Sequence, residues 1–121
     1  MSTHYRQYDT SETPEATREA VRRTLLENDG VLAIATTYPT GAGVPLHTHR
    51  FPSVVCVIEG GTLQTTTPEG IVETYDLRSG ETLWSDTGSA HSARNVGSTT
   101  LRLVEIEVKH ARAAAPPARL H

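Results

Sequence analysis

The chain lacks the cysteine pairs whose disulfide bonds stabilise many small secreted proteins: its 121 residues include a single cysteine, Cys56. One cysteine cannot form a disulfide within the chain, so the sequence excludes a disulfide scaffold. The neighbours of Cys56 on both sides are apolar, which favours a buried thiol.

Features of membrane proteins and of nucleic-acid-binding proteins are also missing. No apolar run approaches the roughly 20 residues needed to cross a bilayer. The polar beginning, residues 1–15, has no apolar core of the kind found in signal peptides. A net charge of −3, with acids and bases interspersed, gives no basic surface for nucleic acid. We therefore expect a cytoplasmic protein that binds neither membranes nor nucleic acids.

Aromatic residues make up only 5% of the chain, so a core must rest on valine, leucine and isoleucine. These residues fall in short runs between glycine and proline turns, a pattern typical of an all-β sandwich or barrel. The expected strands are Val21–Glu27, Val31–Tyr38, Val44–His49, Ser53–Glu59, Thr62–Thr67, Ile71–Leu77, Glu81–Ser85, His91–Asn95 and Leu101–Lys109.

The length fits one domain. We expect a barrel over residues 20–109, an N-terminal extension over 1–19 and a disordered tail over 110–121, which is rich in alanine, proline and arginine.

Two segments can be interpreted in more than one way. Residues 16–26 fit a helical stripe, but Asn28-Asp29-Gly30 is a turn signal that favours a hairpin, so we expect a short helix near Pro14 and then the hairpin. The last strand carries Leu101, Leu103, Glu105 and Glu107 on one face and Val104, Ile106 and Val108 on the other. We expect its valine and isoleucine face to form the core.

The stretch Gly41–Gly60 contains two histidines, His47 and His49, two residues apart. In an extended strand both imidazoles point the same way and lie roughly 6–7 Å apart along the strand. This spacing lets both rings converge on one metal ion at about 2.0–2.2 Å. A second glycine-flanked stretch supplies His91.

The two stretches resemble the two motifs of the cupin family. The first motif, G-x5-H-x-H-x3-4-E-x6-G, is matched by Gly41, His47, His49 and Gly60. Ser53 stands where the family usually has its glutamate ligand. The resemblance extends over roughly residues 20–109.

The second motif, G-x5-P-x-G-x2-H-x3-N, is matched by Gly80, Gly88, His91 and Asn95, with Asp86 at the position of its proline. Together the motifs imply a jelly-roll barrel, a double-stranded β-helix, with a metal site of His47, His49 and His91. Ser53 and Gln64 are candidates for positions beside the ligands. We expect Ser53 to fill the space of the missing glutamate, whereas a solvated position fits Gln64 equally well.

Three neutral imidazoles would leave a divalent metal with its full charge and up to three open positions. Such a donor set suits iron, zinc or nickel better than manganese, which prefers oxygen ligands. We expect one divalent ion, Fe(II) first, with Zn, Ni or Mn as alternatives. The charge of such a site favours a small anionic chelating substrate.

The leading interpretation is an Fe(II)-dependent dioxygenase, because the three-histidine cupins that resemble this chain include dioxygenases. It assumes a cavity lined mostly by apolar side chains, with few acids to act as general bases. The alternatives are a zinc-dependent lyase, isomerase or cyclase, and a non-catalytic cupin that binds a metabolite or a metal. Small cupins are often dimers through their outer strands, so we also expect a homodimer.

Overall fold

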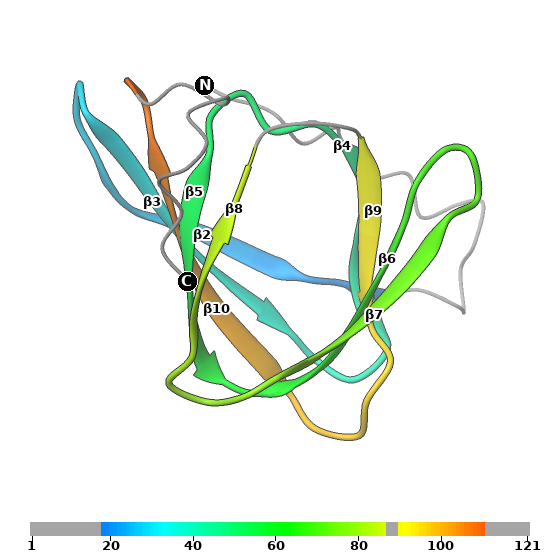
Figure 1. Ribbon diagram of the computed structural model, residues 1–121. Coiled ribbons are helices and arrows are strands. Elements are labelled where there is room, and N and C mark those ends of the chain that lie inside the picture. Colours follow the sequence, from blue (N-terminus) through cyan, green and yellow to red (C-terminus); the bar gives the residue numbers. More distant parts are fainter. Residues whose placement is uncertain (1–17, 87–89, 111–121) are drawn as a thin grey trace.

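A computed structural model describes residues 18–86 and 90–110, which form two five-stranded β-sheets that face each other (Figure 1). The strands of the first sheet are, in spatial order, β1 (Arg18–Glu19), β4 (Ala42–His47), β9 (His91–Asn95), β6 (Gly61–Thr66) and β7 (Val72–Leu77). Those of the second sheet are β2 (Val21–Glu27), β3 (Val31–Tyr38), β10 (Leu101–Val108), β5 (Ser53–Glu59) and β8 (Thr82–Ser85). The predicted all-β class is confirmed.

Every expected strand is present, with ends that differ from the prediction by two residues at most. The additional strand is β1, which pairs in parallel with β4 and begins within the expected N-terminal extension. The helix expected near Pro14 and residues 111–121 of the expected tail lie outside the described residues. No helix in the described ranges is long and apolar enough to cross a membrane.

The hairpin of β2 and β3 turns at Asn28, whose side-chain oxygen accepts hydrogen bonds from the backbone N–H groups of Gly30 and Val31 at 2.8 and 2.9 Å. This local bond stabilises the turn without any help from the core. The strand alternative is therefore confirmed for residues 21–27, and the helical alternative for them is wrong.

The core lies between the two sheets and is built from small and medium apolar side chains. Its buried members are Tyr38, Val44, Val55, Val57, Ala93, Leu101 and Leu103. Cys56 lies on the other face of β5 from Val55 and Val57 and is half-buried, so its thiol faces away from the core.

The inner face of β10 differs from the prediction. Leu101 and Leu103 are buried in the core, and Glu107, with 1% of its surface exposed, shares their face. The valine and isoleucine face is only half-buried and points outward. The prediction failed because it used only the pattern of apolar residues, and this pattern favours the face of β10 without charged residues as the core face. Here the interior is polar enough to accept two glutamates.

Candidate metal centre

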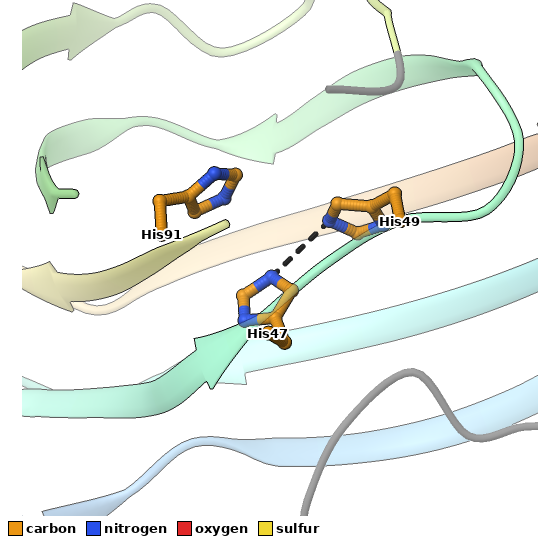
Figure 2. A group of neighbouring side chains, drawn as sticks. All are labelled: His47, His49 and His91. Atoms are coloured by element: carbon orange, nitrogen blue, oxygen red, sulfur yellow. Dashed lines mark hydrogen bonds between the residues drawn. The ribbon is translucent and has the colours of Figure 1, made fainter. Parts of the chain in front are cut away.

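Pairing between β4 and β9 brings the two motifs together. His47, at the end of β4, is the register partner of His91, at the start of β9. The register between these strands shifts between Val44 and His47, next to Pro45, which has no N–H to donate to a sheet. His49 follows two residues after β4 ends, and Figure 2 shows its ring turned back toward His47 and His91.

The ring of His47 has a defined orientation. Its Nδ1 lies 2.8 Å from the carbonyl oxygen of Pro45. A carbonyl only accepts hydrogen bonds, so Nδ1 carries the hydrogen and Nε2 of the neutral ring carries a lone pair. This Nε2 lies 3.2 Å from Nε2 of His49 (Figure 2). The backbone of β4 thus aims one lone pair of His47 at the other histidine.

The distances between the three rings fit a shared ion. Two nitrogens each about 2.1 Å from one metal are roughly 3.0 Å apart at a right angle and roughly 3.4 Å apart at a tetrahedral angle. The observed 3.2 Å between the two Nε2 atoms lies within that range. One ring nitrogen from each of His47, His49 and His91 lies within 4.8 Å of the others, so the three rings form one cluster. The three predicted ligands are therefore brought together.

Burial prepares His47 for this role. Its side chain is 5% exposed, and burial lowers its pKa to about 3, helped by the positive charge that His49, His91 and Arg22 can carry. A ligand histidine must be unprotonated, so a ring that resists protonation is a suitable donor.

A carboxylate that the sequence analysis missed lies behind His49. Oε2 of Glu107, on β10, lies 3.7 Å from Nδ1 of His49. Glu107 is the register partner of Ser53 on β5, and Ser53 is 2% exposed. Ser53 thus lies inside the barrel as expected, and Glu107 is placed directly across from it. Glu107 was not among the predicted site residues, because we expected its face of β10 to point outward.

A cavity of about 330 Å³ adjoins the histidines. His49 and His91 contribute to its wall, and the side chains around it are mixed: Leu63, Thr65, Glu73, Tyr75, Leu83, Trp84 and Glu105 are among them. The lining is largely apolar, as expected, but two carboxyl groups, those of Glu73 and Glu105, also face this space.

Glu105 is half-buried in the cavity wall. Burial raises the pKa of its carboxyl group, and the charge of Glu107 adds to that effect, while the positive charges of His49 and Arg22 oppose it. A carboxyl group with a raised pKa next to a cavity is better suited to accept and return protons than an ordinary one.

Gln64 does not lie beside the ligands. Its neighbours Leu63 and Thr65 line the cavity, and successive residues of β6 face opposite sides, so Gln64 points outward. Its amide lies 3.4 Å from the hydroxyl of Thr74 on the exposed surface. The candidate position for Gln64 beside the metal is therefore wrong, and the solvated alternative holds.

Elsewhere in the cavity wall, the hydroxyl of Tyr75 donates a 2.6 Å hydrogen bond to Oε1 of Glu73. This bond is the main reason that the pKa of Tyr75 is raised. Both side chains line the cavity and belong to β7, so they add a second polar group to its wall.

Comparison with known proteins identifies the fold. A family model described as cupin matches residues 7–116. No curated protein matches the chain. Among solved structures, the chain is similar to a cupin domain from Bordetella pertussis Tohama I, with 29% identity and a TM-score of 0.69 over 74% of this chain and 93% of that one.

Two further solved structures share the fold at lower identity. A conserved protein from Klebsiella pneumoniae with a double-stranded β-helix domain is 21% identical, with a TM-score of 0.61 over 85% of this chain and 89% of its own. The polyketide cyclase RemF from Streptomyces resistomycificus is 22% identical, with a TM-score of 0.57 over 75% of this chain and 66% of its own. The jelly-roll barrel implied by the two motifs is confirmed.

Proposed function

Since the chain belongs to the cupin family, we propose that His47, His49 and His91 bind one divalent metal ion and that the protein is a metal-dependent enzyme. Its substrate would be a small anionic chelating molecule held in the adjoining cavity. The observation that carries this proposal is the 3.2 Å approach of two imidazole nitrogens at the wall of a cavity of about 330 Å³. When bound, the metal would act as a Lewis acid on an oxygen of the substrate.

The groups around the cavity favour proton transfer as the reaction. Glu105 lies in the wall together with His49 and His91, and its carboxyl group has a raised pKa. It is therefore suited to remove a proton from a carbon next to a carbonyl group and to return it elsewhere. The hydroxyl of Tyr75, bonded to Glu73, offers a further polar contact in the cavity wall. We accordingly place an isomerase, lyase or cyclase with zinc as its metal first.

An Fe(II)-dependent dioxygenase is the second candidate. It is supported by the ligand cluster, which consists of three neutral nitrogen donors and so leaves open positions for both substrate and oxygen. We place it second because the largely apolar wall also contains the carboxyl group of Glu105, which is suited to proton transfer. A non-catalytic binding protein is the third outcome of the experiment below.

Metal binding is tested by metal analysis of the purified protein and by zinc titration. Replacing any one of His47, His49 and His91 by alanine should remove most of the bound metal, because two imidazoles hold zinc far less tightly than three. His110→Ala is the matched control, since His110 is exposed and lies outside the cluster. Full occupancy in the His91→Ala protein would contradict the site.

The reaction is tested with a panel of enolisable dicarbonyl compounds, hydroxy-ketones and keto acids in deuterated water. We expect the zinc protein to exchange the hydrogen next to the carbonyl without oxygen, and Glu105→Gln to lose this exchange by 10²-fold or more. If only the iron protein reacts, by taking up oxygen, and Glu105→Gln does not change the rate, the dioxygenase is favoured over this proposal. Binding without exchange or oxygen uptake would leave the non-catalytic alternative.

The homodimer and the cytoplasmic location stay proposals. The outward face of β10 and β5, with Val104, Ile106, Val54 and Cys56, is half-buried and apolar, which supports association of two copies through this sheet. Sedimentation should give twice the chain mass, and Ile106→Glu should give monomers. A wild-type protein that sediments as a monomer would contradict the proposed homodimer.

A further inference from the structure

We propose that Glu107 is the positioning residue of the metal centre: it accepts a hydrogen bond from Nδ1 of His49 and so holds Nε2 of that ring toward His47 and His91. The first motif usually has a glutamate ligand at the position of Ser53. Glu107 supplies a carboxylate in its place, but it contacts the ligand His49 rather than the metal. The inference rests on the metal site proposed above.

The contact between Glu107 and His49 is the first support. Oε2 of Glu107 lies 3.7 Å from Nδ1 of His49, about 0.5 Å beyond the usual range for an N–H···O hydrogen bond. Only 1% of the Glu107 side chain and 10% of the His49 side chain are exposed, so water screens this contact little. An approach of about 0.5 Å between the two groups would complete the bond.

The direction of the ring is the second support. Nε2 of His49 faces Nε2 of His47 at 3.2 Å, while Nδ1 faces Glu107. The two nitrogens of one imidazole thus have separate partners. A hydrogen bond at Nδ1 fixes which nitrogen keeps its hydrogen and leaves the other as the metal donor.

The place of Glu107 relative to Ser53 is the third support. The two residues are register partners on the antiparallel strands β10 and β5, and both are buried. Directly opposed residues of such strands have Cβ atoms about 4.5–5.5 Å apart, so their side chains share one space. The short serine leaves room there for the carboxyl group of Glu107.

The position behind the ligand has a chemical consequence. Among the described residues, the cluster of ligand atoms contains three histidines and no carboxylate. Glu107 therefore adds negative charge next to the centre without using a coordination position. A carboxylate on the far nitrogen also makes an imidazole a stronger donor. The metal would keep open positions for the substrate and lose part of its excess positive charge.

The test compares Glu107→Gln, Glu107→Leu and the wild-type protein by zinc affinity, measured in competition with a chelator. Glutamine keeps an acceptor oxygen without the charge, and leucine removes both. Loss of such outer partners typically weakens metal binding 10- to 100-fold, so we expect about 10-fold for glutamine and about 100-fold for leucine. Glu59→Gln is the control, since Glu59 is an exposed acid paired with Arg102.

A second measurement separates positioning from mere stability. In the ¹⁵N-labelled zinc protein, Nδ1–H of His49 should give a downfield proton signal that is protected from exchange and lost in Glu107→Leu. Glu105→Gln removes an acid from the same face of β10 and should keep this signal. Should Glu107→Leu fail to fold, Glu107→Gln still gives both measurements.

The outcomes separate this inference from the proposed function. Zinc binding by all Glu107 variants within twofold of wild type would overturn the role of Glu107 and leave the three-histidine site intact. Failure of the wild-type protein to bind any divalent metal would overturn the proposed function. In that case the Nδ1–H signal of His49 in the metal-free protein tests whether Glu107 orients this ring. If the wild-type protein lacks the signal, the pairing of Glu107 with His49 is overturned as well. A loss of affinity equally large in Glu105→Gln would assign the effect to general charge.

Discussion

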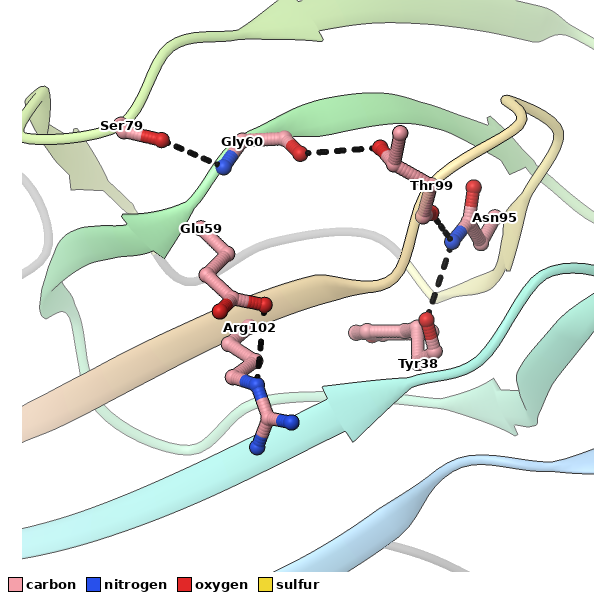
Figure 3. Close-up of polar contacts among 7 residues, drawn as sticks. All are labelled: Tyr38, Glu59, Gly60, Ser79, Asn95, Thr99 and Arg102. Atoms are coloured by element: carbon pink, nitrogen blue, oxygen red, sulfur yellow. Dashed lines mark hydrogen bonds and ion pairs between the residues drawn. The ribbon is translucent and has the colours of Figure 1, made fainter.

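The side-chain amide of Asn95, the last residue of β9, donates a 2.9 Å hydrogen bond to the backbone oxygen of Tyr38, the last residue of β3 (Figure 3). The bond joins the two sheets, because β9 and β3 belong to different ones. The same amide donates to the oxygen of Thr99 at 2.7 Å, and its own oxygen accepts from the N–H of Gly97 at 2.9 Å. The asparagine of the second motif therefore connects the barrel and is not a ligand.

Replacement of Asn95 by alanine should lower the free energy of unfolding by about 3 kcal/mol. Asn95 and its bond to the carbonyl group of Tyr38 are buried, so this carbonyl would lose its donor without gaining water. The carbonyl group of Thr99 would lose a donor as well. Urea denaturation of the metal-free protein measures the change. Gln64→Ala is the matched control, an amide on the exposed surface, and should cost less than about 0.5 kcal/mol. Equal losses in the two variants would contradict this role of Asn95.

The last glycine of the first motif, Gly60, is required by a close approach of the backbone. A Cβ atom at Gly60 would lie 2.3 Å from the oxygen of Leu77 and 2.9 Å from the nitrogen of Ser79. The N–H of Gly60 also donates to Oγ of Ser79 at 2.9 Å (Figure 3). This contact fastens the beginning of β6 to the turn after β7.

We expect Gly60→Ala to destabilise the protein by about 3 kcal/mol or more, because backbone atoms rather than flexible side chains must move. At Gly30 the nearest atom to an added Cβ is Oδ1 of Asn28, at 3.6 Å, which is ordinary contact. Gly30→Ala should therefore change stability by less than about 1 kcal/mol. Thermal unfolding of the two variants side by side measures the difference, and similar melting temperatures would contradict the close approach.

Local signals in the sequence were sufficient for the strands and for the cluster of three histidines. Turns such as Asn28-Asp29-Gly30 are stabilised by bonds within a few residues, so they are visible in the sequence. The histidines were predicted because two motifs with fixed spacing occur in the right order. His49 nevertheless lies beyond the end of β4, so its convergence with His47 comes from the loop rather than from strand alternation.

The surroundings of the site could not be predicted, because they depend on which face of a strand turns inward. In β10 both faces carry apolar residues, and the choice is set by its partners β3 and β5, far away in the sequence. Glu105 and Glu107 were therefore assigned to the wrong side. Neighbouring residues of a strand face opposite sides, and in β6 the prediction chose the wrong side: it placed Gln64 next to the metal, whereas Thr65 lines the cavity.

The metal-free protein should lose stability as the pH falls below about 6.5. Burial lowers the pKa of His47 to about 3 in the folded state, whereas the unfolded chain protonates this ring near its ordinary value, about 6.5. Between these values the unfolded chain binds more protons, so protonation favours unfolding by up to about 1.4 kcal/mol per pH unit. Below about pH 3 this contribution no longer changes.

Urea denaturation from about pH 7.5 to 4.5 measures this dependence, and His47→Leu should make it less steep by up to that amount. His110→Ala is the control, because His110 is exposed and should leave the slope unchanged. The same slope in wild type and His47→Leu would contradict the depressed pKa of His47.

The position of Ser53 can be tested by restoring the carboxylate of the motif. In Ser53→Glu the new carboxyl group would enter the buried space opposite Glu107, its register partner on β10. Two carboxylates that share such a space repel each other, so the metal-free variant should be destabilised. A divalent ion relieves the repulsion, so we expect tighter binding of Mn(II) and Fe(II) and weaker binding of anionic ligands.

The double variant Ser53→Glu, Glu107→Gln separates these effects. Removing the second charge should recover stability in the metal-free protein, so the two changes should be non-additive by about 1 kcal/mol or more. Metal titrations and urea denaturation of the four proteins of this cycle give both quantities. Additive changes in stability, with no change in metal affinity or selectivity, would show that the side chain at position 53 meets neither Glu107 nor the metal, and the register between β5 and β10 would have to be revised.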